Sequence, residues 1–122
     1  MTSKIKDINI ENHIWIIYLI IIVASWYSNS LEKRYFLYND QESKDKYRKL
    51  LIKIFLILII VYIYFFKSSL TSVNELASSD SSKKVLLTKL SMFASLLILI
   101  SGIIYLYIAY MDQDIDVEIA FN

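Results

Sequence analysis

The sequence contains no cysteine, no proline and only one glycine among its 122 residues. Average soluble chains carry roughly 7% glycine and roughly 5% proline, the residues from which tight turns are usually built. A chain with almost none of them makes few tight reversals, and this argues against strand-rich folds. The lack of cysteine excludes disulfides, thiolate chemistry and cysteine-based zinc or iron–sulfur sites.

An excess of charge of one sign is also lacking, because 13 basic residues face 12 acidic ones and leave a formal net charge of +1. We expect no nucleic-acid partner, since such proteins carry a strongly basic field. The single histidine, His13, stands at the edge of an apolar run, and the sequence holds no nucleophile–base pair, glycine-rich phosphate loop or cluster of metal ligands. We therefore predict no enzymatic activity, no cofactor and no metal site.

Apolar residues make up 57% of the chain and gather in three runs, at about 14–31, 50–66 and 90–111. A helix that spans a bilayer needs about 20 mostly apolar residues, with about 17 as the lower limit. The second and third runs reach that length, and the first reaches it only when Ser28 to Leu31 are included. Because Ile54 to Phe66 is apolar or aromatic throughout, every face of that helix needs protein or lipid around it. A chain this short cannot surround three such helices with protein, so lipid is the better surrounding.

We therefore predict an all-α integral membrane protein, a single membrane domain over residues 1–122, whose three transmembrane helices form an up-down-up antiparallel bundle. A second interpretation of the first run is a cleaved signal peptide, because Lys4 and Lys6 precede the apolar stretch and small residues follow it. Against cleavage, Asp7 and Glu11 lie between the lysines and the run.

The first polar segment, 32–49, is charged and aromatic and carries its own signal for a break. Asn39 and Asp40 belong to the residue types that cap helices and turn chains without glycine. We expect the first helix to extend beyond the membrane to about Tyr38 and the second to begin near Glu42.

The second polar segment, 67–89, is rich in serine, yet its apolar residues recur at helical spacing. The second helix is therefore expected to continue to about Ala77. Ser79 to Ser81 are residues that cap helix N-termini, and they predict the start of the third helix.

Aromatic residues stand at the ends of the three runs, where amphipathic rings prefer the level of the lipid headgroups. Lys53 lies one turn inside the second run, and its long side chain can return the ammonium group to the interface. The predicted interface anchors are Lys53 together with Trp15, Trp26, Tyr27, Tyr62, Tyr64, Tyr105, Tyr107 and Tyr110.

Lysine and arginine predict the orientation in the membrane, since loops rich in them stay on the cytoplasmic side. They are most concentrated in the loop 32–49, which favours an N-terminus outside and a C-terminal tail inside. Abundant isoleucine, lysine and tyrosine are typical of AT-rich genomes. The predicted location is a bacterial cell membrane, crossed several times.

Small residues share one face of the third run. Thr88, Ser91, Ser95 and Gly102 are spaced by three, four and seven residues, which keeps them on one side of a helix. Small residues let helix backbones approach closely, and their hydroxyl groups bond across the contact. The favoured interpretation is packing within the chain, with Ala24 and Ser28 acting likewise on the first run, and self-association or a polar pore lining are the alternatives. The predicted helix-packing residues are Ala24, Ser28, Ser91, Ser95 and Gly102.

The C-terminal tail, 112–122, alternates acidic and apolar residues from Asp114 onward. In an extended chain this pattern gives one acidic and one apolar face, which could add to the sheet edge of a partner. A solvated tail is one alternative, and pairing with the basic first loop is another. The predicted partner-binding residues are Asp114, Ile115, Asp116, Val117, Glu118, Ile119 and Phe121.

These features favour a small, non-catalytic, multi-pass membrane protein that acts as an accessory, scaffold or interaction subunit. Its expected partners are the lipid bilayer and either another membrane protein or further copies of the chain. In size and number of spans the chain also resembles phage holins and the small membrane proteins that confer immunity to bacteriocins. The resemblance to holins implies a homo-oligomeric pore as the alternative function.

Overall fold

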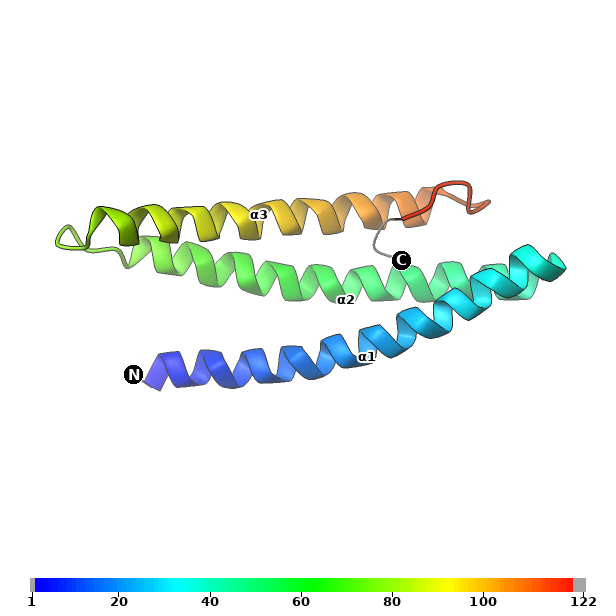
Figure 1. The fold of residues 1–122 in the computed structure, drawn as a ribbon, viewed down its shortest axis with the longest axis horizontal. Helices are drawn as coiled ribbons and strands as arrows, with labels where there is room; N and C mark the ends of the chain where they lie inside the picture. The colour runs from blue at the N-terminus through cyan, green and yellow to red at the C-terminus, as the bar shows by residue number, and fades with distance from the viewer. Residues whose placement is uncertain (1, 120–122) are drawn as a thin grey trace. The chain divides into compact units, whose positions relative to one another are not determined.

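In the computed structural model, which describes residues 2–119 and the side chains of residues 4–119, the chain consists of three helices (Figure 1). They are α1 (Thr2–Tyr38), α2 (Gln41–Asn74) and α3 (Ser82–Met111). Each is long and apolar enough to cross a membrane. The prediction of an all-helical protein with three long apolar helices is confirmed.

The break between α1 and α2 falls at Asn39 and Asp40, as predicted. Asn39 has a φ of 53°, in the left-handed region that asparagine tolerates better than most residues. The Asp40 carboxylate accepts hydrogen bonds from the Glu42 amide at 3.2 Å and from the Ser43 hydroxyl at 2.8 Å. Asp40 therefore caps the first turn of α2, where backbone N–H groups have no partner inside the helix.

The connection between α2 and α3 is also closed by an aspartate. The Asp80 carboxylate accepts from the Ala77 amide at 2.7 Å and from the Lys84 ammonium at 3.1 Å. Ser81 is the N-cap of α3, and its hydroxyl accepts from the Lys84 amide at 3.1 Å. The predicted cap of the third helix is confirmed.

The predicted end of the second helix is wrong by three residues, because α2 ends at Asn74 and not at Ala77. The Ala77 amide binds the Asp80 carboxylate, so it no longer extends the helical ladder. The Asp80 carboxylate thus takes the place of a backbone carbonyl as the acceptor for this amide. The spacing of apolar residues up to Ala77 carries no sign of such a side-chain contact.

The chain divides into two units. Unit 1, Met1–Ile54 with Gln113–Asn122, contains α1, the beginning of α2 and the tail that follows α3. Unit 2, Phe55–Asp112, contains the rest of α2 and all of α3, which run antiparallel as a helical hairpin (Figure 1). That the whole chain forms a single membrane domain stays a prediction.

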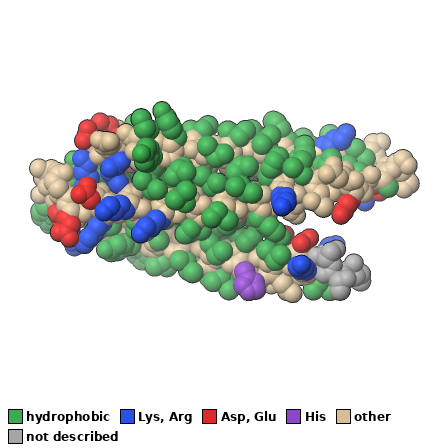
Figure 2. Space-filling model, turned by 180° about the vertical axis from the view of Figure 1, so that it is seen from behind, with side chains coloured by type: hydrophobic (Ala, Val, Ile, Leu, Met, Phe, Trp, Pro, Cys, Tyr) green, Lys and Arg blue, Asp and Glu red, His purple; other side chains and the backbone are tan. Residues whose placement is uncertain are grey.

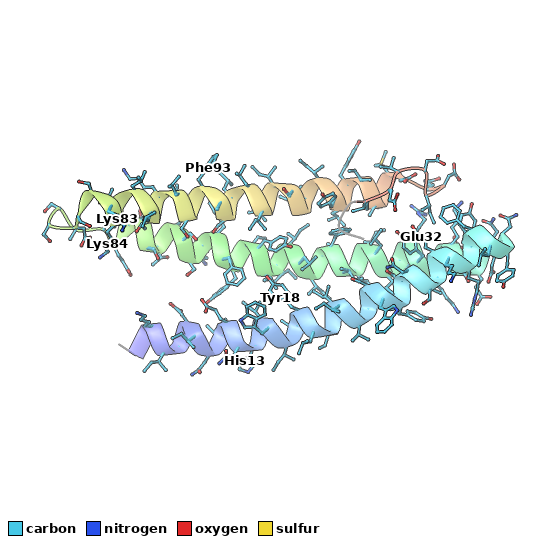
Figure 3. All side chains as sticks on the ribbon, in the orientation of Figure 1. His13, Tyr18, Glu32, Lys83, Lys84 and Phe93 are labelled. Atoms are coloured by element: carbon cyan, nitrogen blue, oxygen red, sulfur yellow. The ribbon has the colours of Figure 1, made fainter. Side chains whose placement is uncertain are left out.

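Large apolar side chains remain exposed along all three helices. Only 11% of the apolar stretch of α3 is buried. In Figure 2 hydrophobic side chains cover the middle of the helices, while charged side chains gather towards helix ends. Phe93 on α3 points away from α2, within unit 2, and is 54% exposed (Figure 3). Exposed apolar surface of this extent is typical of sites that contact a membrane or another protein.

The Asp40 cap predicts a dependence of stability on acid pH. The hydrogen bond from Ser43 is the largest cause that lowers the pKa of Asp40, and the backbone amides and the Arg34 charge lower it further. A lowered pKa in the folded state stabilises the fold above the unfolded value of about 3.9. This stabilisation is lost as the pH falls through the lower folded value.

We expect Asp40→Asn to reduce the difference in melting temperature between pH 7 and pH 3, measured by circular dichroism of the protein in detergent. The matched control is Asp45→Asn, which removes an exposed carboxylate one turn further along α2. An equal reduction in both variants would contradict a specific effect of the cap.

Candidate functional site

The two helices of unit 2 approach closely at Gly102, the only glycine of the chain. A Cβ atom added there would lie 3.0 Å from Cδ2 of Tyr62 and 3.4 Å from Cγ1 of Ile59. Gly102 is buried. The lack of a side chain at this position therefore lets the backbone of α3 lie directly against the Tyr62 ring of α2.

A polar contact joins the same two helices nearer the connection. The hydroxyl oxygens of Ser69 on α2 and Ser95 on α3 lie 2.8 Å apart and share a hydrogen bond. Ser95 also lies 2.9 Å from the Ser91 carbonyl oxygen, to which its hydroxyl can donate. Ser91 itself is exposed. Of the two predicted serines, the structure thus brings Ser95 into the helix contact and leaves Ser91 on the surface.

An aromatic contact lies towards the other end of the unit 2 hairpin. The rings of Phe55 and Tyr105 are stacked, with centroids 5.7 Å apart, and Phe55 is only 2% exposed. No sequence pattern described above singles out Phe55, Ile59 or Ser69. Tyr62 and Tyr105 are predicted interface anchors, whereas the structure places both rings in the contact between α2 and α3.

One regular spacing links these contacts and could have revealed them. Buried or contacting residues recur every seven positions on both helices, a spacing that keeps residues on one face over two turns. Two of the three residues in the row on α2 are large and aromatic, and all three in the row on α3 are small. We call these two rows the seam: Phe55, Tyr62 and Ser69 on α2, and Ser95, Gly102 and Ala109 on α3.

In unit 1, the predicted packing residues Ala24 and Ser28 lie on α1. Ser28 is fully buried, and its hydroxyl donates to the Ser25 carbonyl at 2.7 Å, while Ala24 is half-buried. Other side chains buried in the same unit include Leu31 on α1 and Tyr47 and Leu51 on α2. The buried part of unit 1 therefore includes residues from both helices beside their connection.

The other predicted interface anchors keep exposed side chains, apart from Tyr64, which is half-buried and makes an edge-to-face contact with Phe65 at 5.5 Å. Exposure is what a ring or an ammonium group at the lipid headgroups requires. The exposed anchors are Trp15, Trp26, Tyr27, Lys53, Tyr107 and Tyr110.

The tail contacts the basic first loop through an ion pair in unit 1. Nζ of Lys44 lies 3.2 Å from Oδ1 of Asp114 and 5.4 Å from the centre of the Tyr35 ring. The Lys44 side chain is 13% exposed, and that of Asp114 is 74% exposed. The interpretation that the tail pairs with the basic loop is confirmed for this residue pair.

The tail is not the continuous extended segment that its alternating pattern suggested. Within the described part, 112–119, it forms neither helix nor strand, and Ile115 has a left-handed φ of 56°. A left-handed residue interrupts an extended backbone, so acidic and apolar residues do not keep two opposite faces. Ile119 is buried while Val117 is exposed. The predicted contact residue Phe121 lies outside the described residues.

Chemistry-bearing side chains are widely spaced. Among residues 2–119 no three His, Asp or Glu side chains lie close enough to hold a metal ion. His13 is exposed on α1 (Figure 3), and its Nδ1 lies 2.7 Å from the Asn9 carbonyl oxygen, to which it can donate. Lack of enzymatic activity and of cofactors stays a prediction.

No protein-family model, characterised protein or solved structure gives a significant match to this chain. Function must therefore be argued from the chain's own residues. The two candidate functional sites are the seam between α2 and α3 and the contact between the tail and the first loop.

The seam predicts that Gly102 tolerates no large side chain. Gly102→Leu places branched carbons where the Tyr62 ring lies, and overpacking of this kind costs about 1–3 kcal/mol of folding stability. The measurement is the midpoint of thermal unfolding in detergent, followed by circular dichroism.

Ala94→Leu is the matched control, because Ala94 is an exposed small residue on the same helix. It is expected to leave the midpoint nearly unchanged. If Gly102→Leu also leaves it unchanged, Gly102 is not a packing residue and the seam is wrong.

Proposed function

We propose that this chain is an integral membrane protein that crosses the bilayer three times, in up-down-up order, and acts without catalysis as an accessory or scaffold subunit. The observation that carries the membrane assignment is the exposure of large apolar side chains along the middle of every helix. Burying one such side chain is worth about 1.5–3 kcal/mol, so many of them cannot stay in water. Examples are Leu19, Ile20 and Val23 on α1, Ile60 on α2 and Ile98 and Ile103 on α3.

The ion pair between Lys44 and Asp114 supports the order of crossings. Lys44 precedes the apolar part of α2, and Asp114 follows α3. A 3.2 Å contact requires both residues to be on the same side of a membrane. Two crossings, one by α2 and one by α3, satisfy this requirement, and a single crossing does not.

The separation of apolar spans from polar segments supports a role in binding a partner and not in catalysis or transport. Within the described residues no acidic side chain lies in the predicted spans, and the basic one, Lys53, is exposed near an end. Ion pathways and proton relays need ionisable groups that face the interior of a bundle. The polar surface of unit 1, formed by the first loop and the tail, is then the part available to a partner outside the bilayer.

The proposed location is a bacterial cell membrane, with the first loop and the tail in the cytoplasm and the N-terminus outside. The pore alternative places Ser91 and Ser95 in a lumen. The hydrogen bond between Ser95 and Ser69 supports packing within the hairpin in preference to a lumen.

The chain has no cysteine, so single cysteines report topology without background. We expect Gln41→Cys and Val117→Cys to be protected from a membrane-impermeant maleimide in intact cells. Ser79→Cys, in the other connection, is expected to react. All three positions are exposed in the structure. Reaction of Gln41→Cys and Val117→Cys, with Ser79→Cys protected, would reverse the orientation and keep the crossings by α2 and α3. Gln41→Cys and Val117→Cys on opposite sides of the membrane would contradict these two crossings.

The scaffold function predicts a stoichiometric companion. Purification of a tagged chain from its native membrane in mild detergent is expected to yield a second membrane protein or further copies, identified by mass spectrometry and by particle mass. Truncation after Asp112 should reduce the yield of this companion several-fold, and Lys83→Ser, in the opposite loop, should not. A lone chain with no companion, together with leakage of dye from liposomes that is lost in Ser91→Leu, would favour the pore instead.

A further inference from the structure

The end of unit 1 at the first loop carries exposed basic side chains from both helices. Lys33 and Arg34 on α1 and Lys46 and Lys49 on α2 are all exposed. Lys46 pairs with Glu42 on its own helix at 3.2 Å. The others make no ion pair with any described residue. Figure 2 shows Lys and Arg side chains gathered where α1 and α2 meet.

This surface lies at the depth of lipid headgroups if the chain crosses the bilayer as proposed. A helix rises 1.5 Å per residue, so Lys49, Lys46 and Lys44 stand about 1.5, 6 and 9 Å outside Leu50, where the apolar run begins. The headgroup layer occupies about 5–8 Å on each side of the hydrocarbon core. Lysine ammonium groups on this part of α2 can therefore reach lipid phosphates.

The tail contacts a further basic residue of the same loop. Asp114 binds Lys44 and is itself mostly exposed, so solvent and lipid can reach its carboxylate. The described tail holds four acidic residues, Asp112, Asp114, Asp116 and Glu118, and no basic one. An anionic membrane surface attracts the basic loop and repels the acidic tail, so both forces act to separate them.

We propose that the tail is a displaceable strap, which occupies Lys44 in a neutral bilayer and which the headgroup phosphates of anionic phospholipids displace. The inference rests on the proposed membrane topology. The contacts that oppose the release include the ion pair of Lys44 and the burial of Ile119, which is 7% exposed. Release uncovers the Lys44 side chain and frees the acidic tail for a partner.

The test measures the separation of the tail from the first loop in nanodiscs. Spin labels at Gln41→Cys and Val117→Cys, both in unit 1 and both exposed, report it by double electron–electron resonance. In phosphatidylcholine alone we expect one short distance. In equal parts of phosphatidylcholine and phosphatidylglycerol, the short-distance population should fall by half or more.

Variants of single charges identify the contact. In phosphatidylcholine, Asp114→Asn and Lys44→Gln should each lose the short distance, because each removes one partner of the ion pair. Glu118→Gln and Lys46→Gln are matched controls that remove the same charges elsewhere, and both should keep it. Loss of the short distance in all four variants would overturn the specific role of Lys44 and Asp114.

Two further arms separate the lipid surface from other causes. Inorganic phosphate added to phosphatidylcholine nanodiscs should leave the short distance in place, as should sodium chloride at equal ionic strength. Release by either would overturn displacement by lipid. A short distance that persists in phosphatidylglycerol, in protein that resists alkaline extraction from vesicles, overturns the strap and leaves the proposed topology standing. Extraction by alkali contradicts the topology, and the strap with it.

Discussion

A carboxylate that accepts a backbone N–H group closes each of the two helix connections, and the rest of the fold depends on these two contacts. Asp40 binds the amide of Glu42, and Asp80 binds the amide of Ala77. In a chain without proline and with one glycine, the usual turn residues are missing. Aspartate side chains take their place because they satisfy helix-end N–H groups directly. The helices, which are 37, 34 and 30 residues long, can therefore continue for about eight to ten turns.

Local signals in the sequence were enough to predict the helices and most of their ends. The residue types of Asn39 and Asp40 alone predict the break between the first two helices, and that of Ser81 predicts a helix cap. The end of α2 was placed too late because it depends on Asp80, which follows the helix and captures the Ala77 amide. The shape of the tail was missed for a similar reason. Its alternating pattern says nothing of the left-handed backbone at Ile115.

The helix contacts were less predictable, because each depends on two helices at once. Gly102 and Ser95 could be picked out as small residues on one face, but their partners Tyr62 and Ser69 could not. A tyrosine near the end of an apolar run is typical of a lipid interface, so Tyr62 was predicted to be an interface anchor. Its contact with Gly102 was therefore not predicted. The seven-residue spacing on both helices is the sequence signal that could have paired them. It sets the aromatic residues Phe55 and Tyr62 of α2 against a row of small residues on α3.

Large residues on α2 face small residues on α3 in the seam, and the proposed lipid surrounding gives a physical reason for this match. Lipid tails are as apolar as leucine, so helices in a bilayer gain little from hiding apolar surface and associate through close packing and hydrogen bonds. The rings of Phe55 and Tyr62 supply the volume on α2, and Gly102 and Ala109 supply the space on α3. The hydrogen bond of Ser69 with Ser95 adds a directional contact.

The contact between the tail and the first loop differs in kind, because it includes an ion pair between Lys44 and Asp114. Exposed ion pairs contribute about 0–1 kcal/mol, since water competes with both partners. Lys46 with Glu42 is such a pair, with side chains 58% and 77% exposed. Lys44 is only 13% exposed and lies over the Tyr35 ring, so its ammonium group has already lost much of its water and is held in place. Asp114 stays open to solvent. Another anion can therefore replace the Asp114 carboxylate while Lys44 and its helix keep their positions.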